Sequence, residues 1–336
     1  MRAWTYAAYG GPDVLEQTDI ETPTPGPGQV LVTIEVASIN PADWHSMRGE
    51  PLAVRAVTGL RVPKAPAVIG SDVAGVVTAV GEGVTTVSIG DRVVAEVNRG
   101  ACADAVVMNE KAAVRIPDSL DFESAAALPM AGLTALQAVR RVRGSLEGAR
   151  ILVNGASGGI GSLAVQLATD RGAIVTGVCS VRNGAMVAAL GAASVIDYER
   201  DDFTAGAPGY DAIIDTVGNR STSDLRRALR CGGTIVQVSG GNGGRLLGPV
   251  MRQLGDTITS IPNGQRFVFF VATADPVDLA EIMALAAAER IRPVIDRVVP
   301  FDEVPAAMAH LETGHARGKV LIRIRWASRE CGVCMN

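Results

Sequence analysis

The spacing of apolar and polar residues changes near residue 120 of this 336-residue chain. Before that point, apolar residues occur in short β-rich runs at 29–36, 68–80 and 91–95. Gly and Pro lie between the runs, as in the segment Pro23-Thr24-Pro25-Gly26-Pro27-Gly28. Short strands at regular spacing, separated by such turns, are typical of all-β domains. The pattern predicts a barrel-like β domain in the N-terminal third.

Beyond residue 123 the pattern alternates between helical and strand periodicity. We expect first a helical stretch at 123–143 that is interrupted at Pro129. The expected elements that follow are strand 150–154, helix 159–170, strand 173–178, helix 183–190, strands 194–196 and 211–215, helix 221–230, strand 234–238, helix 277–290, strand 294–299, helix 304–312 and strand 319–324. Apolar strands that alternate with amphipathic helices predict a doubly wound parallel sheet.

Composition and charge narrow the classes of function. Apolar residues make up 48% of the chain and the mean hydropathy is +0.24, which is enough material for two cores. The net charge of −4 comes without a dense basic run, which argues against nucleic acid or a membrane surface as partner. Residues 151–169 carry no charge, but their four glycines, Asn154 and Gln166 indicate a strand–turn–helix rather than a membrane span.

The start of the chain and the cysteines both predict a cytoplasmic protein. The segment Met1-Arg2-Ala3-Trp4-Thr5-Tyr6 lacks the apolar stretch of a signal peptide. The five cysteines are odd in number and have no framework spacing, which is typical of reduced thiols. We interpret Cys331 and Cys334 as part of a C-terminal tail rather than as a metal or redox site.

A glycine-rich loop follows the expected strand 150–154. Ala156, Gly158 and Gly161 form an A-x-G-x-x-G pattern that leads into the helix 159–170. The first small residue permits a tight turn, Gly158 lets backbone approach a diphosphate, and Gly161 lets the helix pack on the strand. The helix N-terminus then offers free N–H groups and its positive dipole end to the phosphates. A packing turn would use similar glycines, but strand, loop, helix and second strand follow in the order of a dinucleotide-binding fold.

The end of the second strand selects the dinucleotide. NAD-binding folds usually place an acid about 20 residues past the loop, where it holds the ribose 2′-hydroxyl. Here the segment 177–183 contains no acid. Ser180 can donate a hydrogen bond, and Arg182 can pair with a 2′-phosphate in forked geometry. NADP(H) is therefore favoured, and a solvated cation at a helix start is the alternative interpretation of Arg182.

Further motifs occur in order along residues 1–325. They are Tyr9–Leu15, Ser38–Asp43, Gly70–Val77, Gly90–Val93, Ala131–Ala135, Asn154–Gly161, Asp215–Asn219 and Gly314–Val320. With these motifs the chain resembles the medium-chain dehydrogenase/reductase superfamily, in particular its zinc-free quinone oxidoreductase-like branch. The resemblance implies an α/β fold with a GroES-like catalytic domain at 1–122, an NADP-binding Rossmann domain at 123–265, and a segment at 266–336 that returns to the catalytic domain.

The resemblance also implies where the site residues lie. It places Asn40 beside the nicotinamide and Thr134 in the nicotinamide pocket, while Asp43 and His45 are interpreted as lining the active-site cleft. An exposed loop histidine is the alternative for His45. The residues expected to contact the cofactor are Gly155, Ala156, Ser157, Gly158, Gly159, Ile160, Cys179, Ser180, Arg182, Tyr198, Val217, Gly218, Asn219, Ser239, Gly240, Phe269, Phe270, Val271 and Lys319. Because members of the superfamily commonly pair through the edge of the Rossmann sheet, a homodimer is expected.

A metal site is not expected. Zinc-dependent members of the superfamily carry a cysteine near the position of segment 40–43 and a His-Glu pair where this chain has Ser71 and Asp72. Catalytic zinc needs three protein ligands of the Cys, His or carboxylate kind. The region that would hold a structural zinc, 98–118, contains Cys102 as its one cysteine.

Asp72 is the acid in an otherwise apolar run, Pro66–Val77. A buried acid must be paired or hydrogen-bonded. We interpret it as a structural acid at the cleft edge, held by backbone N–H groups or by an arginine such as Arg92.

The reaction class follows from these expectations. Without a Lewis acid to polarise an alcohol, hydride delivery to an enone or quinone needs mainly positioning and a polar environment for the developing oxygen. The sequence therefore predicts an NADPH-dependent reductase of quinones or α,β-unsaturated carbonyls. Water, Tyr9 or His45 can supply the proton, and no residue stands out as the general acid. Two alternatives stay open: a zinc-independent alcohol dehydrogenase or ketoreductase acting on a C=O group, and a non-catalytic NADPH-binding regulatory or structural protein.

Overall fold

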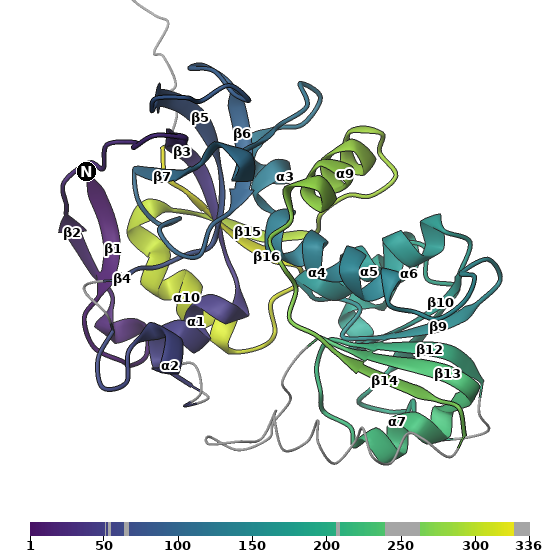
Figure 1. Cartoon of the computed structure of the whole chain (residues 1–336). Coiled ribbons are helices and arrows are strands. Elements are labelled where there is room, and N and C mark those ends of the chain that lie inside the picture. Colours follow the sequence, from purple (N-terminus) through teal and green to yellow (C-terminus); the bar gives the residue numbers. More distant parts are fainter. Residues whose placement is uncertain (51, 53–54, 64–66, 206–208, 239–262, 326–336) are drawn as a thin grey trace, which may run out of the picture.

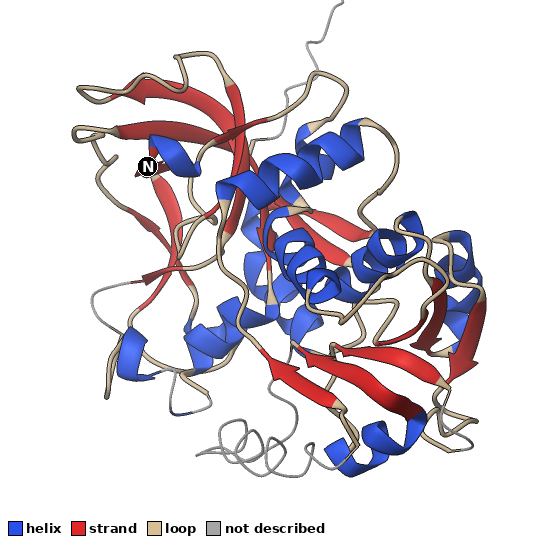
Figure 2. Cartoon of the chain, turned by 45° about the vertical axis from the view of Figure 1, so that its right-hand side comes forward, coloured by secondary structure: helices blue, strands red, loops and turns tan. Residues whose placement is uncertain are grey.

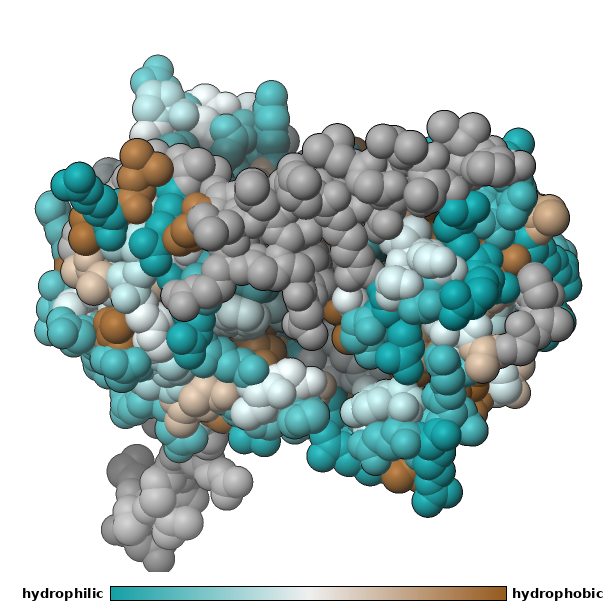
Figure 3. Space-filling view, turned by 90° about the horizontal axis from the view of Figure 1, so that it is seen from below, coloured by the Kyte–Doolittle hydropathy of each residue, from teal (hydrophilic) through white to brown (hydrophobic). Residues whose placement is uncertain are grey.

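The computed structural model describes residues 1–50, 52, 55–63, 67–205, 209–238 and 263–325, and the statements below concern those residues. Figure 1 shows two lobes joined along helices α4 (Pro129–Arg140) and α9 (Pro276–Ala287). In Figure 2 the strands form separate groups in the two lobes, with helices packed between them. Figure 3 shows hydrophilic side chains over most of the described surface on the lower face, with apolar residues in small groups.

The sheet of one lobe is doubly wound. Its strand order is β11-β10-β9-β12-β13-β14, with neighbouring strands parallel throughout. The strands are β9 (Arg150–Asn154), β10 (Ile174–Cys179), β11 (Ser194–Asp197), β12 (Tyr210–Asp215), β13 (Leu229–Gln237) and β14 (Arg266–Phe269). The order reverses at β9, and in such sheets ligands bind outside the carboxyl ends of the strands at that point. Helices α4 and α5 (Gly159–Asp170) lie along one face of the sheet and α7 (Thr222–Ala228) along the other (Figure 1).

The other lobe is built on strand β3 (Gln29–Ile39), which pairs with three further strands. β3 lies between β16 (Lys319–Arg323) and β5 (Asp72–Val80), and it also pairs with β7 (Ala105–Asn109). The remaining strands of this seven-stranded sheet are β6 (Arg92–Glu96), β8 (Val114–Arg115) and β15 (Ile295–Pro300). A small sheet of β1 (Arg2–Tyr6), β2 (Glu16–Asp19) and β4 (Ala67–Val68) lies beside it. Strand β16, near the C-terminal end of the described residues, therefore pairs within the N-terminal lobe.

Short helices connect these strands. They are α1 (Pro41–Arg48), α2 (Arg55–Thr58), α3 (Phe122–Ala126), α6 (Gly184–Ala189) and α10 (Val304–Glu312), with 3-10 turns η1 (Pro12–Val14), η3 (Glu110–Ala112), η4 (Val181–Asn183) and η5 (Phe301–Glu303). The expected helical stretch from residue 123 is two helices, because Pro129 cannot continue the first and instead begins α4.

One apolar core runs across both lobes. It includes Val36, Ala74 and Val94 from the N-terminal sheet and Leu133 and Ile151 from the doubly wound lobe. Burying this surface holds the two lobes together, since apolar burial contributes roughly 25 cal/mol per Å². The lobes thus meet along a packed face, on which α4 lies.

The predicted fold class, a Rossmann sheet with a β-rich second domain, is confirmed. Some details differ from the expectation. The short strands β1, β2, β7 and β8 were not predicted, because their residues show no clear alternation of apolar and polar positions. The sixth strand of the Rossmann sheet, β14, begins at Arg266 and lies beyond the range 123–265 expected for that domain. Ser239 and Gly240 lie outside the described residues.

Candidate active site

The predicted phosphate loop has the geometry of an anion site. β9 ends at Asn154, Gly155 turns the chain with φ 81°, and α5 begins at Gly159 with Gly158 as its N-cap. No side chain of the described residues caps this helix, so its first N–H groups are available to bind an anion. A Cβ at Gly161 would lie 2.1 Å from the carbonyl oxygen of Gly155, so that position requires glycine. The loop therefore fits the diphosphate of a dinucleotide.

A second turn is tied to this loop by a buried carboxylate. Asp215 Oδ1 accepts hydrogen bonds from the backbone N–H groups of Val217 at 3.1 Å and Gly218 at 2.9 Å, and from Asn154 Nδ2 at 2.9 Å. The same Asn154 amide donates to Asn219 Oδ1 at 2.9 Å. The predicted contacts Val217, Gly218 and Asn219 are thus brought to the end of β9, next to the loop.

The predicted selectivity residues gather at the end of β10. Cys179 and Ser180 are buried, and Arg182 is exposed in η4 with its Nη2 donating to the carbonyl of His315 at 3.3 Å. Tyr198, 40% exposed, follows β11, and its backbone N–H donates to the carbonyl of Cys179. These positions are where an adenosine ribose lies in doubly wound folds.

Lys319 joins the phosphate loop to the other lobe. Gly158 and Gly318 form a parallel bridge, and a Cβ at Gly159 would lie 3.0 Å from Cδ of Lys319. The lysine stem therefore passes directly over the N-terminus of α5. Its side chain is 4% exposed and its ammonium group reaches into the N-terminal lobe.

That ammonium group completes a buried network around Asp72. Lys319 Nζ donates to Asp72 Oδ2 at 3.1 Å and also to Asn40 Oδ1. Asn40 Nδ2 donates to the same Asp72 oxygen at 2.9 Å, and Met130 N donates to Asp72 Oδ1 at 3.1 Å. Asp72, 0% exposed, thus caps the N-terminus of α4, where a negative charge is favourable. The network connects α1, α4, β5 and β16 at one point.

A second buried acid lies one step away. Asp43 accepts a hydrogen bond from the backbone N–H of Asn40 at 2.7 Å and another from the hydroxyl of Ser71. Burial, opposed by these two hydrogen bonds, raises the pKa of Asp43 to about 7. Asp43 is therefore a carboxyl that titrates near neutral pH at the start of α1.

A third acid, Glu96, was not predicted. The sheet register sets Ser38 opposite Asp72, and Asp72 opposite Glu96, so the three side chains project from one face. Burial and then the charge of Asp72 raise the pKa of Glu96 to about 8. One feature of the sequence could have indicated Glu96: it directly follows the expected strand 91–95, in the same β domain as Asp72.

Two other predicted residues lie outside the network. His45 Nδ1 is paired with the carbonyl of Glu50 at 2.7 Å, its ring stacks on Trp44, and burial lowers its pKa. Thr134 lies one turn along α4, where its hydroxyl donates to the carbonyl of Met130 at 2.6 Å. The structure thus brings together Asn40, Asp43 and Lys319 but not His45.

Tyr9, the other proton source considered, also has local partners. Its hydroxyl lies 2.7 Å from the hydroxyl of Thr58 and donates to the carbonyl of Gly59 at 2.6 Å. Arg55 lies over its ring. These contacts hold Tyr9 within the α2 region.

The aromatic segment expected over the nicotinamide is split. Phe269 ends β14, and Phe270 is 9% exposed in the shared core with Arg141 over its ring. Val271 is 79% exposed.

Asp72 has partners other than the expected arginine. The guanidinium of Arg92 donates to the carbonyl of Leu120 and lies over the ring of Phe122, so Arg92 as the counter-ion was wrong. Lys319 takes that place because the register of β16 with β3 sets it beside Asp72. A backbone N–H does contribute, from Met130, as expected.

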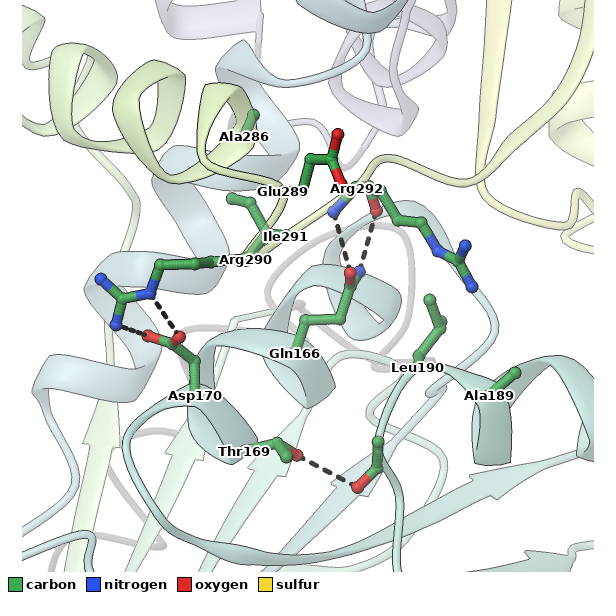
Figure 4. Close-up of a pocket in the computed structure, with 11 residues that line it drawn as sticks. Gln166, Thr169, Asp170, Ala189, Leu190, Ala286, Glu289, Arg290, Ile291 and Arg292 are labelled. Atoms are coloured by element: carbon green, nitrogen blue, oxygen red, sulfur yellow. Dashed lines mark hydrogen bonds and ion pairs between the residues drawn. The ribbon is translucent and has the colours of Figure 1, made fainter.

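A cavity of about 590 Å³ lies elsewhere, at the far end of α5 (Figure 4). Arg290 pairs there with Asp170, and Gln166 is bonded to the backbone of Arg292. Because α5 separates it from the phosphate loop, it contributes nothing to the site described here.

The acidic, histidine and cysteine side chains of the described residues do not form a metal site. Among them, no group of three or more His, Cys, Asp or Glu side chains is arranged to hold a metal ion. Within the same residues, no helix is long and apolar enough to cross a membrane.

Comparisons with known proteins agree with this geometry. Residues 26–135 match the family model of the alcohol dehydrogenase GroES-like domain, and residues 190–322 match that of the zinc-binding dehydrogenase. Over 96% of this chain and 98% of the relative, the sequence is 33% identical to a chloroplast envelope quinone oxidoreductase homolog of Arabidopsis thaliana. The chain belongs to the medium-chain dehydrogenase/reductase superfamily, in its quinone oxidoreductase-like branch.

Other members of the superfamily support the same placement. An NADPH-dependent alkenal/one oxidoreductase of Arabidopsis thaliana is 32% identical over 96% of this chain and 79% of its own length. The quinone oxidoreductase of Coxiella burnetii superposes with a TM-score of 0.85 at 30% identity, covering 97% of this chain and 99% of that one. The chain is therefore an oxidoreductase that uses a nicotinamide cofactor, as predicted.

Proposed function

We propose that this protein is an NADPH-dependent oxidoreductase that reduces a quinone, or the C=C bond of an α,β-unsaturated carbonyl, by direct hydride transfer. The observation that carries the proposal is Lys319, whose stem lies on the phosphate loop while its ammonium group binds Asn40 and Asp72. A cofactor on that loop lies next to this network. The names of relatives, quinone oxidoreductase and alkenal/one oxidoreductase, support the substrate class.

The loop and turn residues would hold the cofactor. The N-terminus of α5 receives the diphosphate, and the turn at Val217–Asn219 lies next to it. Ser180 and Arg182 would hold the 2′-phosphate, which makes NADPH rather than NADH the preferred cofactor. When bound, the reduced nicotinamide supplies a hydride.

The residues of the N-terminal lobe would then stabilise the negative charge that forms on the substrate oxygen. Reduction of an enone or quinone places negative charge on the substrate oxygen, and a fixed cation in a dry site stabilises such charge strongly. Lys319 is the cation that the network holds in place, and Asn40 orients it. Asp43 fixes Asn40 through its backbone N–H. This arrangement needs no metal ion, and zinc-independent catalysis is part of the proposal.

The test is an activity screen with metal analysis. Purified protein is mixed with NADPH and, in turn, with quinones, enones and ketones, and in a separate series with NADP⁺ and alcohols. The absorbance of the reduced nicotinamide is followed in each mixture. We expect turnover with quinones or enones and no stoichiometric zinc. Activity with alcohols alone, or stoichiometric zinc, contradicts the proposal, whereas tight NADPH binding without turnover indicates the binding-protein alternative.

We also propose a cytoplasmic homodimer. Among the described residues, β14 is one of the two edge strands of the Rossmann sheet, and exposed edges can pair with a second copy. Light scattering of the purified chain should give twice the mass of 34.8 kDa, and the mass of a single chain would contradict pairing.

A further inference from the structure

A polar row crosses the sheet of the N-terminal lobe on the face that packs against α4. The register places Leu321, Ser38, Asp72 and Glu96 on adjacent strands, opposite one another. Lys319 lies two residues before Leu321 and therefore projects from the same face. The row thus runs from the phosphate loop, at Lys319, across the sheet to Glu96.

The row and its immediate surroundings contain more carboxyl groups than cations. Asp72 and Asp43 are buried, Glu96 is half-buried, and Lys319 is the cation among them. Three carboxylates with one ammonium group would leave buried negative charge uncompensated, which is expensive in a protein interior. At least one carboxyl therefore keeps its proton at neutral pH.

Within the described part of the chain, Glu96 is the acid of the three that lacks a hydrogen-bond partner. Asp72 accepts three hydrogen bonds and Asp43 accepts two, whereas the carboxyl of Glu96 accepts none from the described residues. Burial, the charge of Asp72 and, to a smaller extent, the charge of Asp43 together raise the pKa of Glu96 to about 8. The charge of Lys319 opposes this increase.

Two further observations concern the ends of the path. The hydroxyl of Ser38, 0% exposed and opposite Asp72, has no hydrogen-bond partner among the described residues, although buried hydroxyls almost always have one. Ser38 and Glu96 flank Asp72 on opposite sides, so this hydroxyl lies on the Lys319 side of Asp72. On the other side, Glu96 lines a cavity of about 20 Å³ with Leu133, Leu279 and Asp275, which is room for one water. Glu96 thus lies between this small cavity and Asp72, its neighbour across the sheet.

We propose that Glu96 holds a proton in reserve for the reduction. After Lys319 has given its own proton to the substrate, Glu96 transfers this proton to Lys319 by way of Asp72. This inference rests on the proposed function. In the reduction, hydride from the reduced nicotinamide forms a C–H bond at the β-carbon of an enone. An N–H bond of Lys319 then breaks and its proton forms the α C–H bond of the substrate.

Lys319 is restored from within the protein. Loss of its proton removes the counter-ion of Asp72, so the O–H bond of Glu96 breaks and its proton moves by way of Asp72 to Lys319. A proton from bulk solvent, relayed through the neighbouring cavity, protonates Glu96 again. One hydride and one proton are consumed per substrate, and the charge on the row returns to its starting value. Glu96 is in this account a positioning residue, because it acts through Lys319.

The test compares Glu96→Gln with Glu96→Asp and with the control Glu82→Gln. Glu82 is an exposed carboxyl of the same lobe. We expect Glu96→Gln to lower kcat for an enone by about tenfold to 100-fold, the lower part of the range for general acid–base groups, with KM unchanged. The decline of kcat above pH about 8 should disappear in this variant, and the solvent isotope effect should rise. Glu96→Asp should restore part of kcat, and Glu82→Gln should match the wild type.

A second readout needs no turnover. In infrared difference spectra, the carboxyl carbonyl stretch that titrates at pH about 8 should be present in the wild type and missing from Glu96→Gln, whereas the stretch of Asp43, which titrates at pH about 7, should remain in both. Loss of that band below pH 6 overturns the proposal, and so does a Glu96→Gln enzyme with wild-type kcat and pH profile. A wild-type protein that reduces no acceptor overturns the proposed function as well, so the two failures are distinguishable.

Discussion

Lys319 Nζ lies 3.1 Å from Asp72 Oδ2, although 247 residues separate the two along the chain. Both side chains are almost fully buried, at 4% and 0% exposed. The pair connects the last strand, which follows the phosphate-loop bridge, to the strand that caps α4. It therefore fixes the position of the cofactor loop relative to the N-terminal lobe.

The first prediction concerns this pair. Replacing Lys319 by Met leaves Asp72 buried without its cation, and such a change costs about 3–5 kcal/mol of unfolding free energy. Urea unfolding measures it. As a control, Arg227→Met removes one partner of an exposed pair with Asp224 and should cost less than about 1 kcal/mol.

A double variant sharpens this test. Lys319→Met combined with Asp72→Asn removes both charges, so it should regain most of the stability that Lys319→Met loses. If the double variant is no more stable than Lys319→Met, the loss is due to packing rather than to charge.

The second prediction concerns the phosphate loop. In Gly161→Ala the new Cβ would lie 2.1 Å from a backbone oxygen, so the loop must shift and unfolding free energy should fall by about 1–3 kcal/mol. Cofactor affinity, measured by fluorescence titration, should fall at least tenfold. Gly184→Ala is the matched control, because its Cβ meets no atom closer than 3.8 Å and alanine favours the helix. Equal affinity in both variants would contradict the assignment of the loop.

Local patterns predicted most of the fold, because strand, loop and helix signals lie within short windows. The boundaries of strand 150–154 and helix 159–170 match the structure. The network around Asp72 could not be predicted, since its partner Lys319 is set by the register of β16 on β3. Glu96 was missed for the same reason, because its role depends on its position opposite Asp72 on the neighbouring strand.

The third prediction concerns the choice of cofactor. Arg182→Ala removes the cation expected at the 2′-phosphate, so the ratio of kcat/KM for NADPH over NADH should fall by about 10-fold to 100-fold, as for other hydrogen bonds to charged groups. Arg200→Ala, another exposed arginine next to a strand end, should leave the ratio unchanged. An unchanged ratio in Arg182→Ala would show that other residues select the cofactor.

The fourth prediction concerns pH. Burial raises the pKa of Asp43 from its ordinary 3.8 to about 7, so the native state holds a proton that the unfolded chain has lost. Its contribution to stability is therefore complete below pH about 4 and is lost as pH rises to about 7. Relative to Asp43→Asn, the wild type should lose up to roughly 4 kcal/mol across that window.

Unfolding by urea at several pH values checks this sign. Glu96 titrates in both proteins, and because Asp43 makes the smallest contribution to its raised pKa, most of its effect cancels in the comparison. A wild type that gains stability relative to Asp43→Asn as the pH rises would mean that Asp43 is held ionised instead.

The most direct test of the account follows the hydride itself. NADPH that carries deuterium at the transferring position of the nicotinamide is incubated with the protein and an α,β-unsaturated ketone, and the product is analysed by mass spectrometry and NMR. The account predicts a saturated ketone with one deuterium at the β-carbon and a solvent hydrogen at the α-carbon. Deuterium at the carbinol carbon of an unsaturated alcohol, or bound NADPH that neither the enone nor a quinone oxidises, would contradict it.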